Sequence, residues 1–253
     1  MPVNGPGQAR EPGRAPYVDL HCHLLPGIDD GVSTLEEGVE LARGLGRLGF
    51  GTVVATPHVR SGYWENTVES IGPALAALRG ALDGDDPEIL FAAENFLDDR
   101  VWDLFKQGGL IGYGEGRAAL VEFPPQAIPI GARDRFFEMR IKGCRPVLAH
   151  PERYAEAWKG SEKIEPLADG GAIFLVDLPS LAGKFGRSPR RTAERLLDEG
   201  LARALCSDAH RPSDLRHVED GMERARRLVG DEGLVELLAS NPREVLAGRF
   251  EHV

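Results

Sequence analysis

The chain has 253 residues, a formal net charge of −10 and an apolar fraction of 42%. This length suits one α/β barrel or two smaller domains, and the apolar fraction is enough for a sizeable core. The negative charge argues against binding to nucleic acid or to an anionic membrane, because both bind basic patches. No apolar run approaches the roughly 20 residues that a membrane-spanning helix needs.

Cysteine usage and the N-terminal composition set the expected compartment and the domain boundaries. Cys22, Cys144 and Cys206 are far apart and form no C-x-x-C, which is typical of a reducing compartment without a disulfide framework. Residues 1–16 are rich in proline and glycine and lack the apolar core of a signal peptide. We therefore expect a cytoplasmic protein with a flexible tail at 1–16 and a single domain at 17–253.

Seven short apolar runs recur along the chain, and each carries a polar residue at or near its end. Their continuous rather than alternating apolar character predicts parallel strands that are buried on both faces. The runs are 17–21, 52–58, 89–95, 118–123, 145–153, 172–180 and 203–210.

Helical patterns separate these runs. A Ser33–Glu36 capping box predicts a helix start, 65–82 has a helical apolar face with Pro73 inside it, and helices are also expected from Ser188 to Gly200, over 218–229 and over 233–247. Seven strand–helix units favour an α/β fold, a distorted (β/α)7 barrel similar to a TIM barrel. An open doubly wound sheet is the alternative.

Histidines and carboxylates gather at the predicted strand ends, where barrel enzymes keep their active sites. Imidazole with carboxylate is a ligand set for zinc, manganese and iron. Nine donors exceed the four that one tetrahedral zinc takes, so we expect two or three divalent ions. The nine candidates are His21, His23, Asp30, His58, Glu94, Glu122, His150, Asp208 and His210.

Seven short motifs over about residues 17–247 resemble those of the PHP superfamily of polymerase and histidinol phosphatase domains. They are D-L-H-C-H, I-D-D-G, A-T-P-H, A-E-N, V-E-F, A-H-P-E-R-Y and S-D-A-H. Within this superfamily they are most similar to the bacterial manganese-dependent protein-tyrosine phosphatases of capsule loci, the CpsB/YwqE type. That resemblance implies the same distorted (β/α)7 barrel.

The resemblance also groups the ligands into three sites. One metal would take His21, His23, Glu94 and Asp208. Glu94 would bridge to a second metal, which Glu122 and His150 complete. Asp30, His58 and His210 would hold the third, while Asp29 stays unassigned. Manganese is the expected metal, with iron and zinc as alternatives.

Two arginines are expected to bind the substrate phosphate. Arg153 matches the family arginine in H-P-E-R-Y, and a guanidinium fork suits phosphate oxygens. The loop that carries the second family arginine is shorter here, so Arg211 or Arg216 fills that role, and Arg211 is favoured because it precedes a proline. Asp177 stands near a position where the family usually has asparagine, and it either adds charge near the metals or accepts a hydrogen bond there.

The implied reaction is hydrolysis of protein phosphotyrosine by a metal-bridging hydroxide. The implied partner is the C-terminal tail of a bacterial tyrosine autokinase that controls polysaccharide export. Histidinol phosphate, or another small phosphate ester, is the nearest alternative substrate. An amidohydrolase-like metal hydrolase is a further alternative, although the sixth predicted strand has Asp177 where that class generally has a histidine. A cysteine-based phosphatase is excluded, because none of the three cysteines has an arginine six residues on.

Overall fold

The computed structural model describes residues 16–124 and 127–250. The predicted tail therefore lies outside the described residues except for Pro16. Ten strands run through the described ranges: β1 (Tyr17–Cys22), β2 (Phe50–Ala55), β3 (His58–Arg60), β4 (Trp64–Glu65), β5 (Glu88–Phe91), β6 (Glu94–Phe96), β7 (Ala118–Glu122), β8 (Arg145–Ala149), β9 (Ile173–Asp177) and β10 (Ala202–Cys206).

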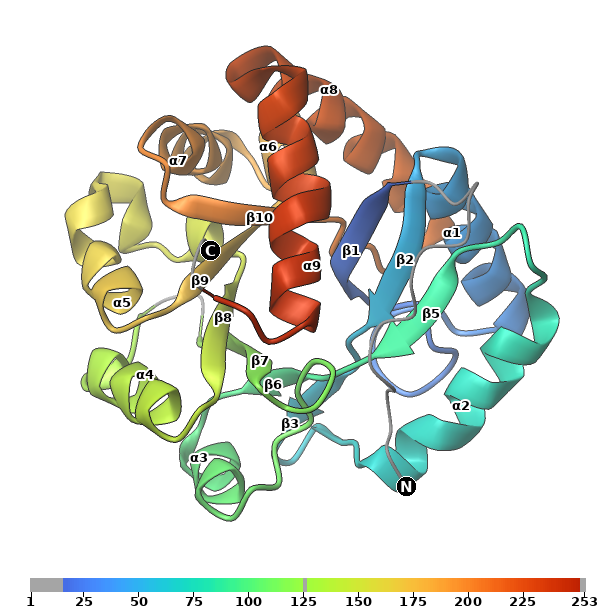
Figure 1. Cartoon of the computed structure of the whole chain (residues 1–253), viewed down its shortest axis with the longest axis horizontal. Helices are drawn as coiled ribbons and strands as arrows, with labels where there is room; N and C mark the ends of the chain where they lie inside the picture. Colours follow the sequence, from blue (N-terminus) through green and yellow to red (C-terminus); the bar gives the residue numbers. More distant parts are fainter. Residues whose placement is uncertain (1–15, 125–126, 251–253) are drawn as a thin grey trace.

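These strands form an irregular ring with most helices around its outside, while α9 (Asn241–Leu246) lies across one end of it (Figure 1). One sheet has the order β1-β2-β5 and the other the order β10-β9-β8-β7-β6-β3-β4, and all pairs are parallel except β3 with β4. The two sheets meet where β2 leads into β3 and β5 into β6, and where Cys22 pairs with Ala209 beyond β10. The predicted α/β fold with seven strand positions is confirmed.

Two of the seven predicted strands are each split in two. Pro57 lacks an N–H and stands between β2 and β3, where the hydrogen-bond ladder is interrupted. The chain bridges the gap with bonds from Ala92 N to Ala55 O at 2.9 Å and from Glu94 N to Pro57 O at 3.1 Å. After the break, His58 and Glu94 pair in register at the starts of β3 and β6. The interruption thus places two candidate metal ligands side by side.

The helices are α1 (Leu35–Arg47), α2 (Val68–Ala81), α3 (Asp99–Lys106), α4 (Ala132–Ile141), α5 (Glu165–Asp169), α6 (Leu178–Ala182), α7 (Arg187–Asp198), α8 (Leu215–Val235) and α9 (Asn241–Leu246). Pro73 lies inside α2, and Gly230 interrupts α8 with a φ of 75°. The segment predicted as one helix over 233–247 holds the end of α8, a π-turn at Glu236–Ser240 and α9.

The capping box of α1 is one residue later than the sequence predicted. Thr34, in extended conformation, is the N-cap, and its side chain accepts a hydrogen bond from Glu37 N at 3.2 Å. The Glu37 carboxylate in turn accepts from Thr34 N at 3.3 Å. The Ser33–Glu36 assignment was therefore wrong. Both pairs satisfy the S/T-x-x-E spacing, and only the backbone conformation of the cap distinguishes them.

Apolar side chains pack in two layers. A larger cluster joins the strands to the outer helices, and a smaller one that includes Leu20, Leu120 and Leu175 fills the ring. Cys22 belongs to the outer cluster although Leu20 belongs to the inner one, and a register shift between Asp19 and Cys22 accounts for this change of side. Cys22 thus faces away from the two histidines that flank it.

Candidate metal centre

All nine predicted ligands are brought together at the C-terminal end of the ring. His21 is the next-to-last residue of β1, His23 directly follows the strand, and Asp208 and His210 come after β10. Side-chain contacts of 3.5 Å or less link every member to at least one other member. Parallel strands place their carboxyl ends at one rim, which is why residues up to 189 positions apart in the sequence converge.

The tightest group contains His21, His23, Glu94 and Asp208. The Nε2 atoms of His21 and His23 are 3.0 Å apart. His21 Nε2 is 3.2 Å from both Glu94 Oε2 and Asp208 Oδ1, and His23 Nε2 is 3.4 Å from the same two atoms. Donors about 2.1 Å from one ion are about 3.0–3.4 Å apart in octahedral or tetrahedral geometry. The spacing of His21, His23 and Asp208 therefore fits a single ion, and Glu94 Oε2 contacts both imidazoles of that trio.

Glu94 connects this group to a second one. Its Oε1 is 2.9 Å from His150 Nε2, while its Oε2 is 3.0 Å from His58 Nδ1. Glu122 lies 3.3 Å from His58 Nδ1 and 3.9 Å from His150 Nε2. A carboxylate whose two oxygens face different donor sets has the arrangement that a bridging ligand needs.

A third, more exposed group forms around Asp30. Its Oδ1 is 3.3 Å from His58 Nε2 and 3.5 Å from His210 Nε2. His58 therefore presents one ring nitrogen to this group and the other to Glu94 and Glu122. The His210 ring stacks on His23 at a centroid distance of 4.0 Å, so His23 also borders the third group.

Backbone strain accompanies two of the candidate ligands. Among the described non-glycine residues, only His150 (φ 37°) and Asp208 (φ 41°) have a positive φ. Each such residue costs about 1–3 kcal/mol and persists where the surroundings fix it, often at functional sites. His150 directly follows β8 and Asp208 comes two residues after β10, so the strained backbone lies where both side chains turn into the rim.

The buried carboxylates of the cluster require positive charge beside them. Burial alone would raise the pKa of Glu94 and Asp208, but nearby histidines, and Arg153 for Asp208, hold both pKa values well below the ordinary range. Burial alone would lower the pKa of His23 and His58, but the surrounding carboxylates raise both well above the ordinary range. The buried carboxylates are stable only beside positive charge, which divalent ions would supply. The donor set thus fits metal ions.

Two acidic residues that sequence reasoning did not assign support the ligands. Asp29 accepts from His23 Nδ1 at 2.8 Å and from the backbone N–H groups of Gly31 and His58 at 2.9 and 3.2 Å. Only glycine fits at position 31, because a Cβ there would lie 2.2 Å from His23 O. The D-D-G motif therefore contains one candidate ligand, one acceptor that orients a candidate ligand, and a tight turn.

Asp19, the first residue of D-L-H, is fully buried behind His21. Its Oδ1 accepts from the backbone N–H groups of Ser207 and His21 at 3.0 and 3.2 Å. These bonds tie the ends of β1 and β10 together just below the candidate ligands. The D-x-H spacing was the available signal for this role.

Arg153 lies at the edge of the cluster, on a short 3₁₀ turn (Pro151–Arg153) after β8. Its Nη2 contacts both Asp177 and Asp208, and its guanidinium lies 3.9 Å from the centre of the Phe185 ring.

The two candidates for the second arginine, Arg211 and Arg216, are both exposed. Arg216 lies 4.0 Å from Asp220, and the backbone N–H of Arg211 donates to Asp214. The structure thus brings Arg153 to the candidate ligands, whereas the choice between Arg211 and Arg216 stays a prediction.

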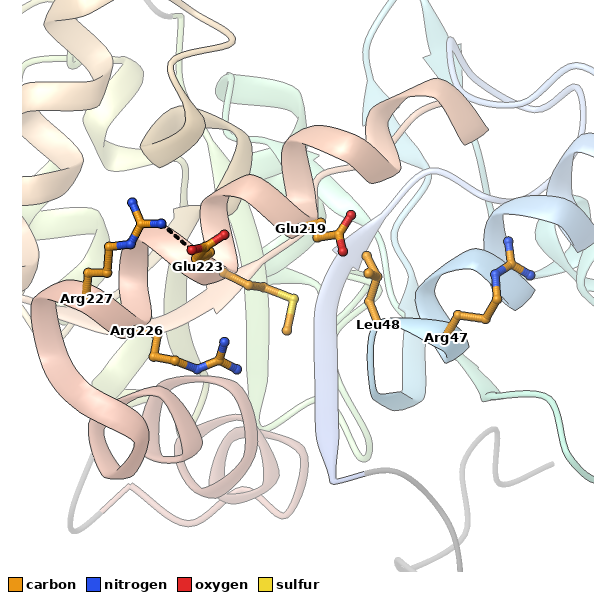
Figure 2. A pocket seen from close by; sticks show the side chains of 7 residues that line it. Arg47, Leu48, Glu219, Glu223, Arg226 and Arg227 are labelled. Carbon is orange, nitrogen blue, oxygen red and sulfur yellow. Dashed lines mark hydrogen bonds and ion pairs between the residues drawn. The ribbon is translucent and has the colours of Figure 1, made fainter.

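A separate surface pocket of about 400 Å³ lies between α1 and α8 (Figure 2). None of its lining residues is a predicted site residue. Its arginines are partly balanced, because Arg227 pairs with Glu223, and Arg226 lies 3.0 Å from Asp231. The lining residues are Arg47, Leu48, Glu219, Met222, Glu223, Arg226 and Arg227.

Comparison with known proteins agrees with the cluster. The family model "Capsular polysaccharide synthesis, CpsB/CapC" matches residues 17–247. The chain belongs to the CpsB/CapC family. It is 32% identical over 195 residues to the tyrosine-protein phosphatase YwqE of Bacillus subtilis, covering 76% of this chain and 77% of that one. It is 24% identical over 237 residues to the tyrosine-protein phosphatase CpsB of Streptococcus pneumoniae, covering 90% and 98%.

A solved structure from the same family has a similar fold. It comes from crystal structures of YwqE from Bacillus subtilis and CpsB from Streptococcus pneumoniae, described as unique metal-dependent tyrosine phosphatases. The TM-score is 0.84 at 29% identity, over 92% of this chain and 95% of that one. The resemblance drawn from the motifs is confirmed. In the described residues of this CpsB/CapC member, no helix is long and apolar enough to cross a membrane.

Proposed function

We propose that the chain is a metal-dependent protein-tyrosine phosphatase. The observation that carries this is the convergence of five histidines and four carboxylates at one rim, with Arg153 in contact with one of them. The named activity of the CpsB/CapC relatives supports phosphotyrosine over histidinol phosphate and over amidohydrolase substrates.

The nine candidate ligands would hold two or three divalent ions, with manganese as the first choice and iron or zinc as alternatives. Such ions, when bound, supply Lewis acidity and an activated water. Arg153, with Arg211 as the second arginine, would hold the nonbridging oxygens of the phosphoryl group and absorb developing charge. The leaving phenol has a pKa of about 10, so it needs little proton assistance. His58 or His210 would supply that proton where it is not fully committed to metal.

The proposed partner is a phosphotyrosyl protein, specifically the C-terminal tail of a bacterial tyrosine autokinase in polysaccharide export. The family description, which refers to capsular polysaccharide synthesis, supports this choice. Since such a tail is in the cytoplasm, the proposal places the enzyme there as well.

The test compares substrates on one metal-loaded preparation. Protein is stripped with a chelator, refilled with manganese, and offered a phosphotyrosyl peptide, a phosphoseryl peptide and histidinol phosphate. We expect metal-dependent turnover that is fastest on the phosphotyrosyl peptide. Faster turnover of histidinol phosphate would overturn the substrate, and equal turnover after chelation would overturn the mechanism.

A variant links activity to the ligands. His21→Ala should lose activity by more than about a hundredfold and should bind less metal, since it removes a donor from the tightest group. Glu194→Gln is the matched control, because Glu194 pairs with Arg190 and Arg224 on α7 and α8 rather than with the candidate ligands. A His21→Ala protein with full activity and full metal content would exclude His21 as a ligand.

A further inference from the structure

The guanidinium of Arg153 is held from three sides. Its Nη2 contacts Asp208, a candidate metal ligand, and Asp177, the last residue of β9. The Phe185 ring covers one face of the guanidinium at 3.9 Å. Parallel pairing of β8 with β9 places Asp177 beside the turn that carries Arg153, so the contact follows from the fold.

The two carboxylates differ in how firmly they are tied to other groups. Asp208 lies 3.2 Å from His21 and 3.4 Å from His23, and its backbone N–H bonds to His21 O. Asp177 accepts from the Cys206 thiol at 3.3 Å through Oδ1, while its Oδ2 faces Arg153. Its side chain is fully buried, so water does not compensate Oδ2.

Arg153 also has a buried donor without an acceptor. Its Nε is inaccessible to solvent and makes no hydrogen bond to any described residue. A buried N–H without a partner is rare and indicates a missing acceptor. Planar guanidinium groups bind phosphate through two adjacent N–H groups, commonly Nε and one Nη. In Arg153 the Nη group that shares this edge with Nε is Nη2. Both carboxylates, Asp177 and Asp208, already contact Nη2.

We propose that Asp177 is a positioning residue that competes with the substrate phosphate for Arg153. With the site empty, Asp177 holds the guanidinium against Phe185. When phosphate bonds to Nε and Nη2, the Asp177 contact is the one released, because Asp208 is fixed by the histidines. Asp177 thus lowers the affinity of Arg153 for phosphate and favours release of the product. This inference rests on the proposed phosphatase function and on Arg153 as its phosphate-binding group.

The first test measures phosphate binding directly. Inorganic phosphate is titrated by calorimetry into zinc-loaded wild type, Asp177→Asn and the control Glu194→Gln, with metal content checked in each. We expect Asp177→Asn to bind phosphate about tenfold more tightly, and its KM for a phosphotyrosyl peptide to fall more than its kcat changes. Unchanged or weaker binding in Asp177→Asn would overturn the proposal.

A double-mutant cycle and a wild-type measurement make the test independent of the stability of one variant. In an Arg153→Ala background, Asp177→Asn should no longer change phosphate affinity, and a persisting effect would contradict action through Arg153.

In the wild type, the ¹⁵Nε–H signal of Arg153, identified by its loss in Arg153→Lys, should shift when phosphate is added to the zinc-loaded protein. A signal that does not move would also overturn the proposal. Tighter phosphate binding by Asp177→Asn without any turnover of phosphotyrosine would refute the proposed function and would leave only the competition between Asp177 and phosphate for Arg153.

Discussion

At the scale of single residues, metal-binding chemistry was readable from the sequence, whereas the groups that orient it were not. Histidine and carboxylate at strand ends pointed to the nine candidates because few other side chains bind transition metals. Asp29 carried no such signal, because an acceptor is defined by the atom it faces, and for Asp19 the D-x-H spacing was the available signal. The contacts of Arg153 to Asp177 and Phe185 likewise depend on neighbouring strands and loops that the sequence does not align.

Asp29 gives a prediction at this scale. Asp29→Asn should weaken metal binding about tenfold to a hundredfold, because the His23 ring loses the carboxylate that orients it. Competition with a chromogenic chelator measures the affinity. Asp99→Asn serves as the control, since it removes an exposed carboxylate that pairs with Arg135 on the outer helices. Equal affinities in the two variants would show that Asp29 does not support the site.

Asp19 gives a prediction about pH. Burial raises its pKa to about 6, although hydrogen bonds from Ser207 and His21 act in the opposite direction. A carboxyl whose pKa is raised in the folded state stabilises the protein below its unfolded pKa, and that contribution is lost as the pH rises through 6. A rise from 3.8 to about 6 corresponds to roughly 3 kcal/mol.

The measurement is urea unfolding of the metal-free protein between pH 4 and pH 7. Over this range the free energy of unfolding of the wild type should fall relative to that of Asp19→Asn by roughly 2 kcal/mol, since part of the roughly 3 kcal/mol is already lost by pH 4. Parallel curves for the two proteins would show that Asp19 ionises in the folded state as easily as in the unfolded chain.

At the scale of elements, the seven strands were predictable, and their interruptions were not. Continuous apolar runs identify buried parallel strands whatever their length. The breaks after β2 and β5 depend on which backbone groups pair across the sheet, and the short β4 hairpin has too few residues for a pattern. The helix start at α1 was misplaced by one residue for a similar reason, since the cap depends on backbone dihedral angles.

The cap can be tested with two neighbouring substitutions. Thr34→Ala should lower the free energy of unfolding by about 1 kcal/mol, because its side chain satisfies the N–H of Glu37. Ser33→Ala should change it by less than about 0.5 kcal/mol, since its backbone rather than its side chain bonds to Glu37. Chemical denaturation of both variants decides between the two caps. A larger loss in Ser33→Ala would restore the assignment made from the sequence.

At the scale of the whole molecule, the rim joins candidate ligands from β1, β3, β6 and β7 and from the segments after β1, β8 and β10. An ion bound there holds segments from both sheets, and the unfolded chain cannot reproduce that arrangement. Metal binding and global stability are therefore linked.

Removal of metal should accordingly lower the melting temperature. At a metal concentration one hundred times the Kd, one site adds about 2.7 kcal/mol, which corresponds to roughly 5–10 °C in a chain of this size. Scanning calorimetry with and without manganese measures the difference, and calcium, which prefers oxygen ligands, is the control. Equal shifts with both ions would point to binding by surface carboxylates instead.

The stacking of Trp64 on His58 gives the molecule an optical reporter of its own. The two rings lie 4.9 Å apart at 17°, on a hairpin fixed by bonds from the Asn66 side chain to Ile28 O and His58 O. Indole emission responds to charge and to paramagnetic ions at such distances, so manganese bound at the Asp30–His58–His210 group should dim this tryptophan. The same group loaded with diamagnetic zinc leaves it brighter. Fluorescence compared between the wild type and Trp64→Phe should therefore follow, in solution, the occupancy of the two groups that His58 borders.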